Sequence, residues 1–155
     1  MPDSSYSSEN SWATSINFTK ATNLKEVVFH FKAFYTIWIV MALETVTLEH
    51  RDLRQISIYL PPSTLLLGDP AKIRQTVGEE IYSQWVKLDH TLVRLWESHA
   101  IRTKVTYDAV SGEEGGVCQC IKGLLPETTK RGVVNLVKSV YIMGYASAAR
   151  HRRRR

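Results

Sequence analysis

The chain has 155 residues, of which 44% are hydrophobic and 23% are charged, the composition of an ordinary globular protein with one domain. Five of its 20 basic residues lie at the C-terminal end, namely Arg150, Arg152, Arg153, Arg154 and Arg155. The other 15 basic residues balance the 15 acidic ones, which argues against a nucleic-acid-binding surface spread over the domain.

The N-terminal segment, residues 1–22, is rich in serine and lacks a hydrophobic period, so we expect it to be disordered. It lacks the basic and apolar regions of a secretory signal, and the sequon at Asn17 is therefore expected to be unused. The longest uncharged apolar run, residues 33–43, has eleven residues, whereas about 20 are needed to span a bilayer. The neighbouring Cys118 and Cys120 fit a reducing compartment. We expect a cytoplasmic or nuclear protein without a membrane partner.

Two stretches, NLKEVVFHF (23–31) and DLRQISIYL (52–60), alternate between hydrophobic and other residues, as half-buried strands do. They match in residue type, position by position, at an interval of 29 residues. The residues predicted to face a core are Leu24, Val27, Phe29 and Phe31, then Leu53, Ile56, Ile58 and Leu60. The residues predicted to face outward are Glu26, Val28 and His30, then Gln55, Ser57 and Tyr59. We expect a helix between the two strands, because parallel strands need a crossover connection.

The stretch GEEIYSQWVKLDHTLVRLWESHA (78–100) predicts a long amphipathic helix. One stripe recurs at steps of three and four residues and consists of Ile81, Trp85, Leu88, Leu92, Leu95 and His99. Asp89 and His90 are predicted to lie on the solvated side, away from this stripe. Thr76 and Glu79 match the spacing of a capping box at the helix start.

The remaining residues predict two more strands and a broken helix. Thr103, Val105 and Tyr107 alternate with polar residues within 101–110, which indicates a third strand. Residues 111–116 are expected to form a turn or loop, 117–132 a helix broken near the proline at 126, and 133–137 a fourth strand. Strands that alternate with helices predict an α/β fold with a short parallel sheet of about four strands.

The 29-residue interval fits a leucine-rich repeat, whose period is about 20–29 residues. In such a domain the helices lie on the convex side and the outward strand residues form a concave binding face. Two unrelated amphipathic strands in an ordinary α/β sandwich remain an alternative, because Val105 follows Ile58 at 47 residues instead. We predict a leucine-rich-repeat-like domain over 23–139 with an atypical C-terminal cap, followed by a tail over 140–155.

Three stretches carry a family resemblance: LRQISIYLP, QWVKLDHTLVRLWESHAIRTKVTY and LLPETTKRGVVNLV, in that order. Together they resemble the C-terminal part of uncharacterised F-box and leucine-rich-repeat proteins of mushroom-forming fungi. The resemblance covers about residues 23–138, and we identify no F-box segment in the chain. It implies a scaffold in which the F-box recruits a ubiquitin ligase and the repeats hold a target protein.

No enzyme, cofactor or metal site is predicted. The sequence holds none of the phosphate-binding, dinucleotide-binding, zinc-protease or serine-hydrolase motifs. Cys118 and Cys120 are too close in sequence to form a zinc site by themselves, and the histidines have no partners at zinc-site spacing. His99 is interpreted as a packed residue at a helix end, so we expect no small-molecule substrate.

The function predicted from these features is a non-enzymatic protein–protein interaction module. Its candidate partner-binding face consists of Glu26, Val28, His30, Gln55, Ser57 and Tyr59. The alternative is a nucleic-acid-associated protein attached through its basic tail, Arg150, Arg152, Arg153, Arg154 and Arg155. This arginine run also fits a nuclear-import signal or a solvated terminus without a role.

Overall fold

The computed structural model describes residues 16–31, 35–60, 69–110 and 112–139. The strands are β1 (Glu26–His30), β2 (Gln55–Tyr59), β3 (Arg102–Tyr107) and β4 (Val134–Lys138). The helices are α2 (Ile37–Leu43), the 3₁₀ turn η2 (Pro70–Lys72), α3 (Ile73–Val77), α4 (Glu79–His99), α5 (Glu114–Leu124) and α6 (Pro126–Lys130).

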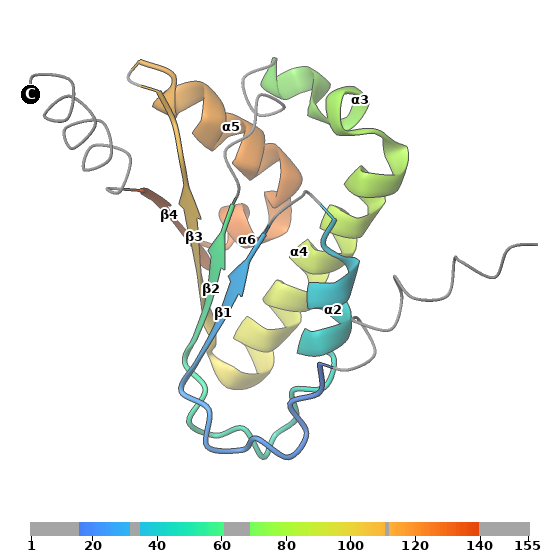
Figure 1. Ribbon diagram of the computed structural model, residues 1–155, viewed down its shortest axis with the longest axis vertical. Helices are drawn as coiled ribbons and strands as arrows, with labels where there is room; N and C mark the ends of the chain where they lie inside the picture. Colours follow the sequence, from blue (N-terminus) through green and yellow to red (C-terminus); the bar gives the residue numbers. More distant parts are fainter. Residues whose placement is uncertain (1–15, 32–34, 61–68, 111, 140–155) are drawn as a thin grey trace, which may run out of the picture.

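The strands form one parallel sheet in the order β1-β2-β3-β4, which is also their order along the chain (Figure 1). This confirms the predicted α/β class with four parallel strands. Glu26 pairs with Gln55, so the predicted 29-residue alignment of the first two strands is their register in the sheet. Ile58 pairs with Val105 across the 47-residue interval.

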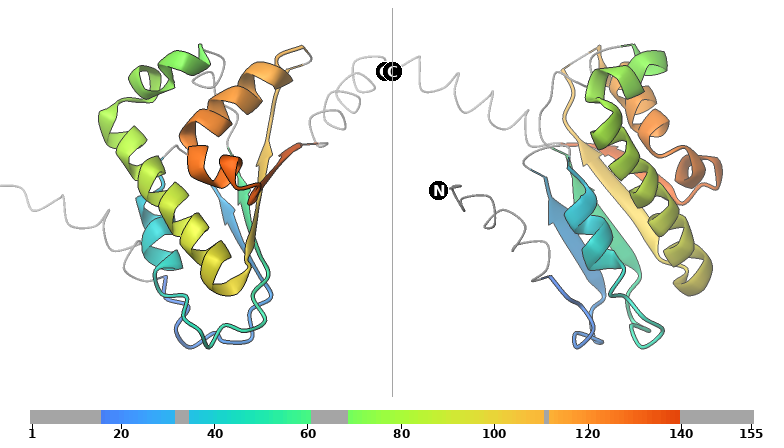
Figure 2. Two further views of the ribbon diagram at one scale, coloured as in Figure 1. Left: turned by 180° about the vertical axis from the view of Figure 1, so that it is seen from behind. Right: turned by 90° about the vertical axis from the view of Figure 1, so that its right-hand side faces the viewer.

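The described helices all lie on one side of the sheet, as Figures 1 and 2 show from three directions. The side chains of β1 and β2 that point toward the helices belong to the core and are at most 7% exposed; they are Val27, Phe29, Ile56 and Ile58. This confirms the alternation predicted from the sequence. None of the helices in the described ranges is long and apolar enough to cross a membrane.

The long helix α4 lies at the centre of the helical layer. Its residues Trp85, Leu88, Leu92 and Leu95 are at most 1% exposed, which confirms the middle of the predicted stripe, whereas its two ends are half-buried. The Gln84 side chain accepts hydrogen bonds from the backbone N–H groups of Thr36 (3.0 Å) and Ile37 (3.3 Å) at the start of α2. The helix therefore supplies the N-terminal cap that α2 lacks in its own sequence.

The prediction that Asp89 lies on a solvated face is wrong, since this residue is only 1% exposed. Its carboxylate accepts hydrogen bonds from the N–H of Glu127 and from the N–H and hydroxyl of Thr128, each at 2.9 Å. These N–H groups begin α6 and have no partner within that helix. Asp89 is buried because it caps α6, whereas the neighbouring His90 is exposed as predicted.

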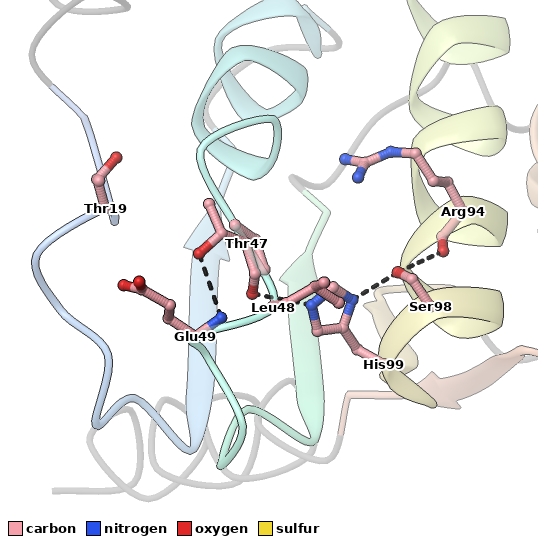
Figure 3. Close-up of a pocket in the computed structure, with 8 residues that line it drawn as sticks. Thr19, Thr47, Leu48, Glu49, Arg94, Ser98 and His99 are labelled. Carbon is pink, nitrogen blue, oxygen red and sulfur yellow. Dashed lines mark hydrogen bonds between the residues drawn. The ribbon is translucent and has the colours of Figure 1, made fainter.

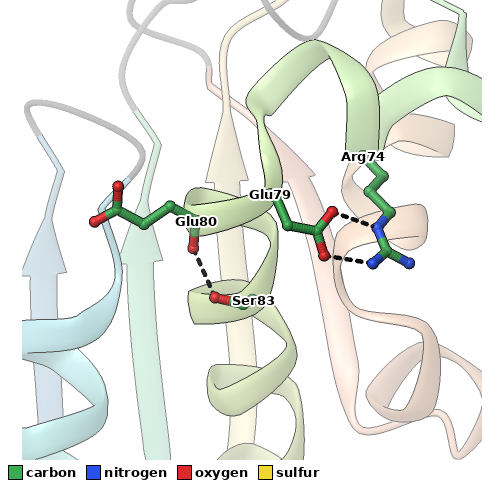
Figure 4. A network of polar contacts seen from close by, with 4 residues as sticks. All are labelled: Arg74, Glu79, Glu80 and Ser83. Carbon is green, nitrogen blue, oxygen red and sulfur yellow. Dashed lines mark hydrogen bonds and ion pairs between the residues drawn. The ribbon is translucent and has the colours of Figure 1, made fainter.

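The predicted capping box at the start of α4 does not form, and Figure 4 shows that the Glu79 side chain points toward Arg74 instead. Gly78, whose φ of 89° favours glycine, separates α3 from α4, and the hydroxyl of Thr76 bonds within α3. Glu79 instead accepts a hydrogen bond from Nε of Arg74 (2.8 Å) and forms an ion pair with it. The hydrogen bond from Arg74 lowers the pKa of Glu79. Both side chains are more than half exposed, so we expect this pair to add little stability.

The helix predicted to break near Pro126 does so. Helix α5 ends at Leu124, α6 begins at Pro126, and Gly132 follows with a φ of 68°. The loop predicted over 111–116 is wrong from Glu114 onward, because α5 begins there. Glu114 forms an ion pair with Lys138, which joins the start of α5 to the end of β4.

Residues 16–22, which belong to the predicted N-terminal segment, contact the domain. The N–H of Phe18 donates to Oγ1 of Thr45 (2.8 Å), and Nε2 of His50 donates to the carbonyl oxygen of Phe18 (2.6 Å). His50 is fully buried, and its Nδ1 accepts from the N–H of Thr47 (3.0 Å). The contacts of the folded part therefore begin before residue 23.

Tyr107, at the end of β3, makes the stability of the fold depend on pH in the alkaline range. Burial raises the pKa of Tyr107 to about 12, and its hydrogen bond with Cys118 (2.9 Å between Sγ and the phenol oxygen) and the charge of the ionised Cys118 thiolate add to this. An unfolded tyrosine ionises near pH 10, so between about pH 10 and 12 ionisation favours the unfolded chain. We expect the ionisation of Tyr107 to leave the free energy of unfolding unchanged below that window and to lower it through the window by about 3 kcal/mol at most.

Urea unfolding of the native chain and of Tyr107→Phe, at a series of pH values from neutral to strongly alkaline, measures this contribution. The variant should lose stability less steeply in the alkaline window. Identical pH dependence in the two chains would show that Tyr107 does not ionise differently on folding.

Candidate functional site

The side of the sheet opposite the helices carries three rows of neighbouring side chains. The rows, from the start of the strands to their ends, are Glu26–Gln55–Arg102, Val28–Ser57–Lys104–Asn135 and His30–Tyr59–Thr106–Val137. We call these residues the open face. The six predicted partner-binding residues all belong to it, and they form its β1 and β2 half.

Two aromatic side chains form a platform at one end of the open face. The rings of His30 and Tyr59 are stacked, with centroids 4.7 Å apart and planes 12° apart. Val28 lies beside them on β1 and is 47% exposed, although it is a large hydrophobic residue. Such a pairing of exposed aromatic and aliphatic groups suits the apolar centre of a binding interface.

A hydrogen-bonded cluster lies at the other end of the open face. Oε1 of Glu26 accepts from the Ser57 hydroxyl (2.5 Å) and from the Gln55 amide (2.9 Å). The hydrogen bond from Ser57 lowers the pKa of Glu26 most, followed by the one from Gln55, and the charge of Lys104 adds to this. Glu26 is therefore ionised at neutral pH, and its position is fixed by neighbours on β2.

Ser57 faces the predicted side but is only 2% exposed. Glu26 and Gln55 bond to its hydroxyl, and Val28 and Lys104 flank it on the adjacent strands. A partner can thus contact the other five predicted residues, while Ser57 holds Glu26 and Gln55 in place beneath it.

The sequence reasoning missed the β3 and β4 half of the open face. Lys104 is partly exposed and has an ammonium group that extends the polar cluster, and Asn135 is exposed beside it. Arg102 lies at the edge, with its guanidinium 5.6 Å from the centre of the Trp96 ring on α4. The alternation that predicted Thr103, Val105 and Tyr107 as one side of β3 also predicts that the residues between them face outward. The open face on β3 could therefore have been predicted from the sequence.

The arrangement of the sheet also bears on the kind of site. In open α/β sheets, nucleotides bind where neighbouring connections leave in opposite directions. The described strands follow one another in chain order, so their sheet contains no such reversal point.

No metal-binding cluster occurs among the described residues. Cys118 and Cys120 form no disulfide. His99 lies at the end of α4, where its Nε2 donates to the carbonyl oxygen of Thr47 (2.8 Å). The predicted basic tail, Arg150, Arg152, Arg153, Arg154 and Arg155, lies outside the described residues.

Comparisons of the chain with family models, with curated proteins and with solved structures find no match. The geometry of the open face is therefore the basis on which a function can be proposed.

Proposed function

We propose that this chain is a non-enzymatic protein-binding module whose partner docks on the open face. The observation that carries the proposal is the one-sided helical layer, which leaves residues of all four strands uncovered by the described helices. The open face combines an ionised Glu26, a cationic Lys104 and the His30–Tyr59 stack. Groups of both charge signs around aromatic anchors match a protein surface better than a polyphosphate.

We further propose that the domain is leucine-rich-repeat-like. Parallel strands in chain order with helices on one side support this architecture, as does the 29-residue register of β1 and β2. The resemblance to F-box proteins would make the open face the part that recognises a target for ubiquitin ligation.

Tyr59→Ala tests the role of the open face. Aromatic anchors carry much of the energy of protein interfaces, so we expect affinity for a captured partner to fall at least about tenfold. The matched control is Tyr82→Ala, which removes an equally half-buried tyrosine from α4 on the helix side. Biolayer interferometry with the purified partner measures both variants. Equal losses of affinity with the two variants, or a loss with Tyr82→Ala alone, would show that the partner contacts another surface of the protein.

The alternative proposal is nucleic-acid association through the arginine tail, which the concentration of positive charge at the C-terminus supports. Deleting residues 150–155 would then abolish binding to a DNA duplex, and affinity in the intact chain would fall steeply with salt. Protein capture that survives this deletion favours the open face.

A further inference from the structure

A depression lies at the C-terminal end of α4, on the helical side of the molecule (Figure 3). It has a volume of about 690 Å³ and an apolar lining for the most part. Its walls come from the α2–β2 loop, the N-terminal segment and the last turns of α4. The lining residues are Thr19, Val46, Thr47, Leu48, Glu49, Arg94, Ser98 and His99.

The side chain of Leu48, at the depression, is apolar and exposed, and we call it the knob. Its exposed fraction of 74% is the highest among the large hydrophobic residues that the structure describes. Two hydrogen bonds hold the loop at Thr47, the residue before Leu48. His99 donates to the carbonyl oxygen of Thr47 (2.8 Å), and the N–H of Thr47 donates to Nδ1 of His50 (3.0 Å). The knob is therefore pre-organised, which reduces the entropy lost when it enters a binding site.

Two opposite charges flank the depression. Three ion pairs occur within the described part of the chain, and neither Glu49 nor Arg94 belongs to one. Figure 3 shows that the Arg94 guanidinium reaches toward the loop, whereas the Glu49 carboxylate points away from it. Both groups can thus pair with groups on another molecule.

We propose that this depression is the contact surface of a symmetric homodimer. Leu48 of each copy enters the depression of the other, and Glu49 of each copy pairs with Arg94 of the second copy. In a two-fold interface, residue i contacts residue j and residue j contacts residue i, so the surface must be complementary to itself. A knob, a hollow and one charge of each sign meet that requirement, whereas a ligand of single charge would leave Glu49 or Arg94 unmatched.

The dimer would leave the open face free. The depression lies by the α2–β2 loop and the end of α4, while the open face lies across the sheet from the helices. Two copies joined in this way present two open faces, which would raise the avidity for a repeated or dimeric partner.

Analytical ultracentrifugation of the full chain and of Leu48→Asp tests the knob. The native chain should show a concentration-dependent dimer of its 17.7-kDa subunits. Burying a charge in the apolar hollow should raise the dissociation constant at least about tenfold. Val110→Asp, at a side chain that is 68% exposed elsewhere, is the control and should leave the constant unchanged. Circular dichroism confirms that each variant is folded.

Charge reversal tests the ion pair independently of the knob. Arg94→Glu and Glu49→Arg should each weaken the dimer, because each places two like charges together, and the double variant should restore it. Lys122→Glu on α5 is the matched control for charge and should have no effect. A native chain that is monomeric at millimolar concentration, or a double variant that is no better than the single ones, overturns the proposal. A monomer in which Leu48→Asp abolishes capture of another protein also overturns it and assigns the depression to that protein.

Discussion

Replacing Trp85 with alanine is expected to lower the free energy of unfolding by about 4 kcal/mol. The side chain is completely buried in the N-terminal half of α4, and the centroid of its ring lies 6.0 Å from that of Phe31, the residue that follows β1. Its removal loses the transfer free energy of an indole and leaves a cavity in the core cluster between the sheet and the helices. Trp85 therefore joins the two layers of the fold.

Urea unfolding followed by circular dichroism measures this loss through the midpoint and the slope. Trp96→Ala is the matched control, because it removes the same side chain from the same helix at a half-buried position. We expect a loss of about 1–2 kcal/mol for this control, in proportion to the smaller area that it buries. Equal effects of the two substitutions would contradict the described packing of α4.

Replacing Asp89 with asparagine is expected to cost about 3 kcal/mol, although the two side chains have nearly the same shape. The carboxylate accepts three hydrogen bonds from Glu127 and Thr128, whereas asparagine has a single acceptor oxygen and would point its NH₂ group at a donor. At least one N–H group at the start of α6 would then have no acceptor. We therefore expect α6 and the adjoining end of α5 to open more readily than the rest of the domain.

Hydrogen exchange of Asp89→Asn tests both the size and the place of this effect. Amide protection should fall most in α5 and α6, and global unfolding in urea should shift by the amount given above. Thr128→Val removes the hydroxyl bond alone and should cost less, while His90→Asn on the exposed side should cost less than about 0.5 kcal/mol. If Asp89→Asn changed neither the hydrogen exchange nor the free energy of unfolding, α6 would not depend on this cap.

Much of the sheet could be predicted from the sequence, because hydrophobic alternation is a local signal that fixes which side of a strand is buried. Strands in chain order were then enough to place Val28 beside Ser57 and His30 beside Tyr59, and the register has both pairs. The 29-residue interval of β1 and β2 does not continue to β3, because η2, α3 and the long α4 all occupy the connection between β2 and β3.

The predictions that proved wrong concern polar residues whose environment depends on distant segments. Asp89 is buried by residues 38 and 39 positions further along the chain, which no periodicity within α4 reveals. The outward orientation predicted for Ser57 is the one observed; what the sequence did not reveal is that its hydroxyl is covered, because Glu26 bonds to it from the neighbouring strand. The capping box failed because Gly78 separates Thr76 from the helix that it was predicted to cap.

Site-specific photo-crosslinking tests the proposed function of the open face most directly. A photoreactive amino acid replaces Val28, which is exposed between the aromatic stack and the polar cluster, or His90, which is exposed on α4. If a partner docks on the open face, it should crosslink to the first position and not to the second. Crosslinking from the helix side, with none from residue 28, would contradict the proposal that the open face is the binding surface.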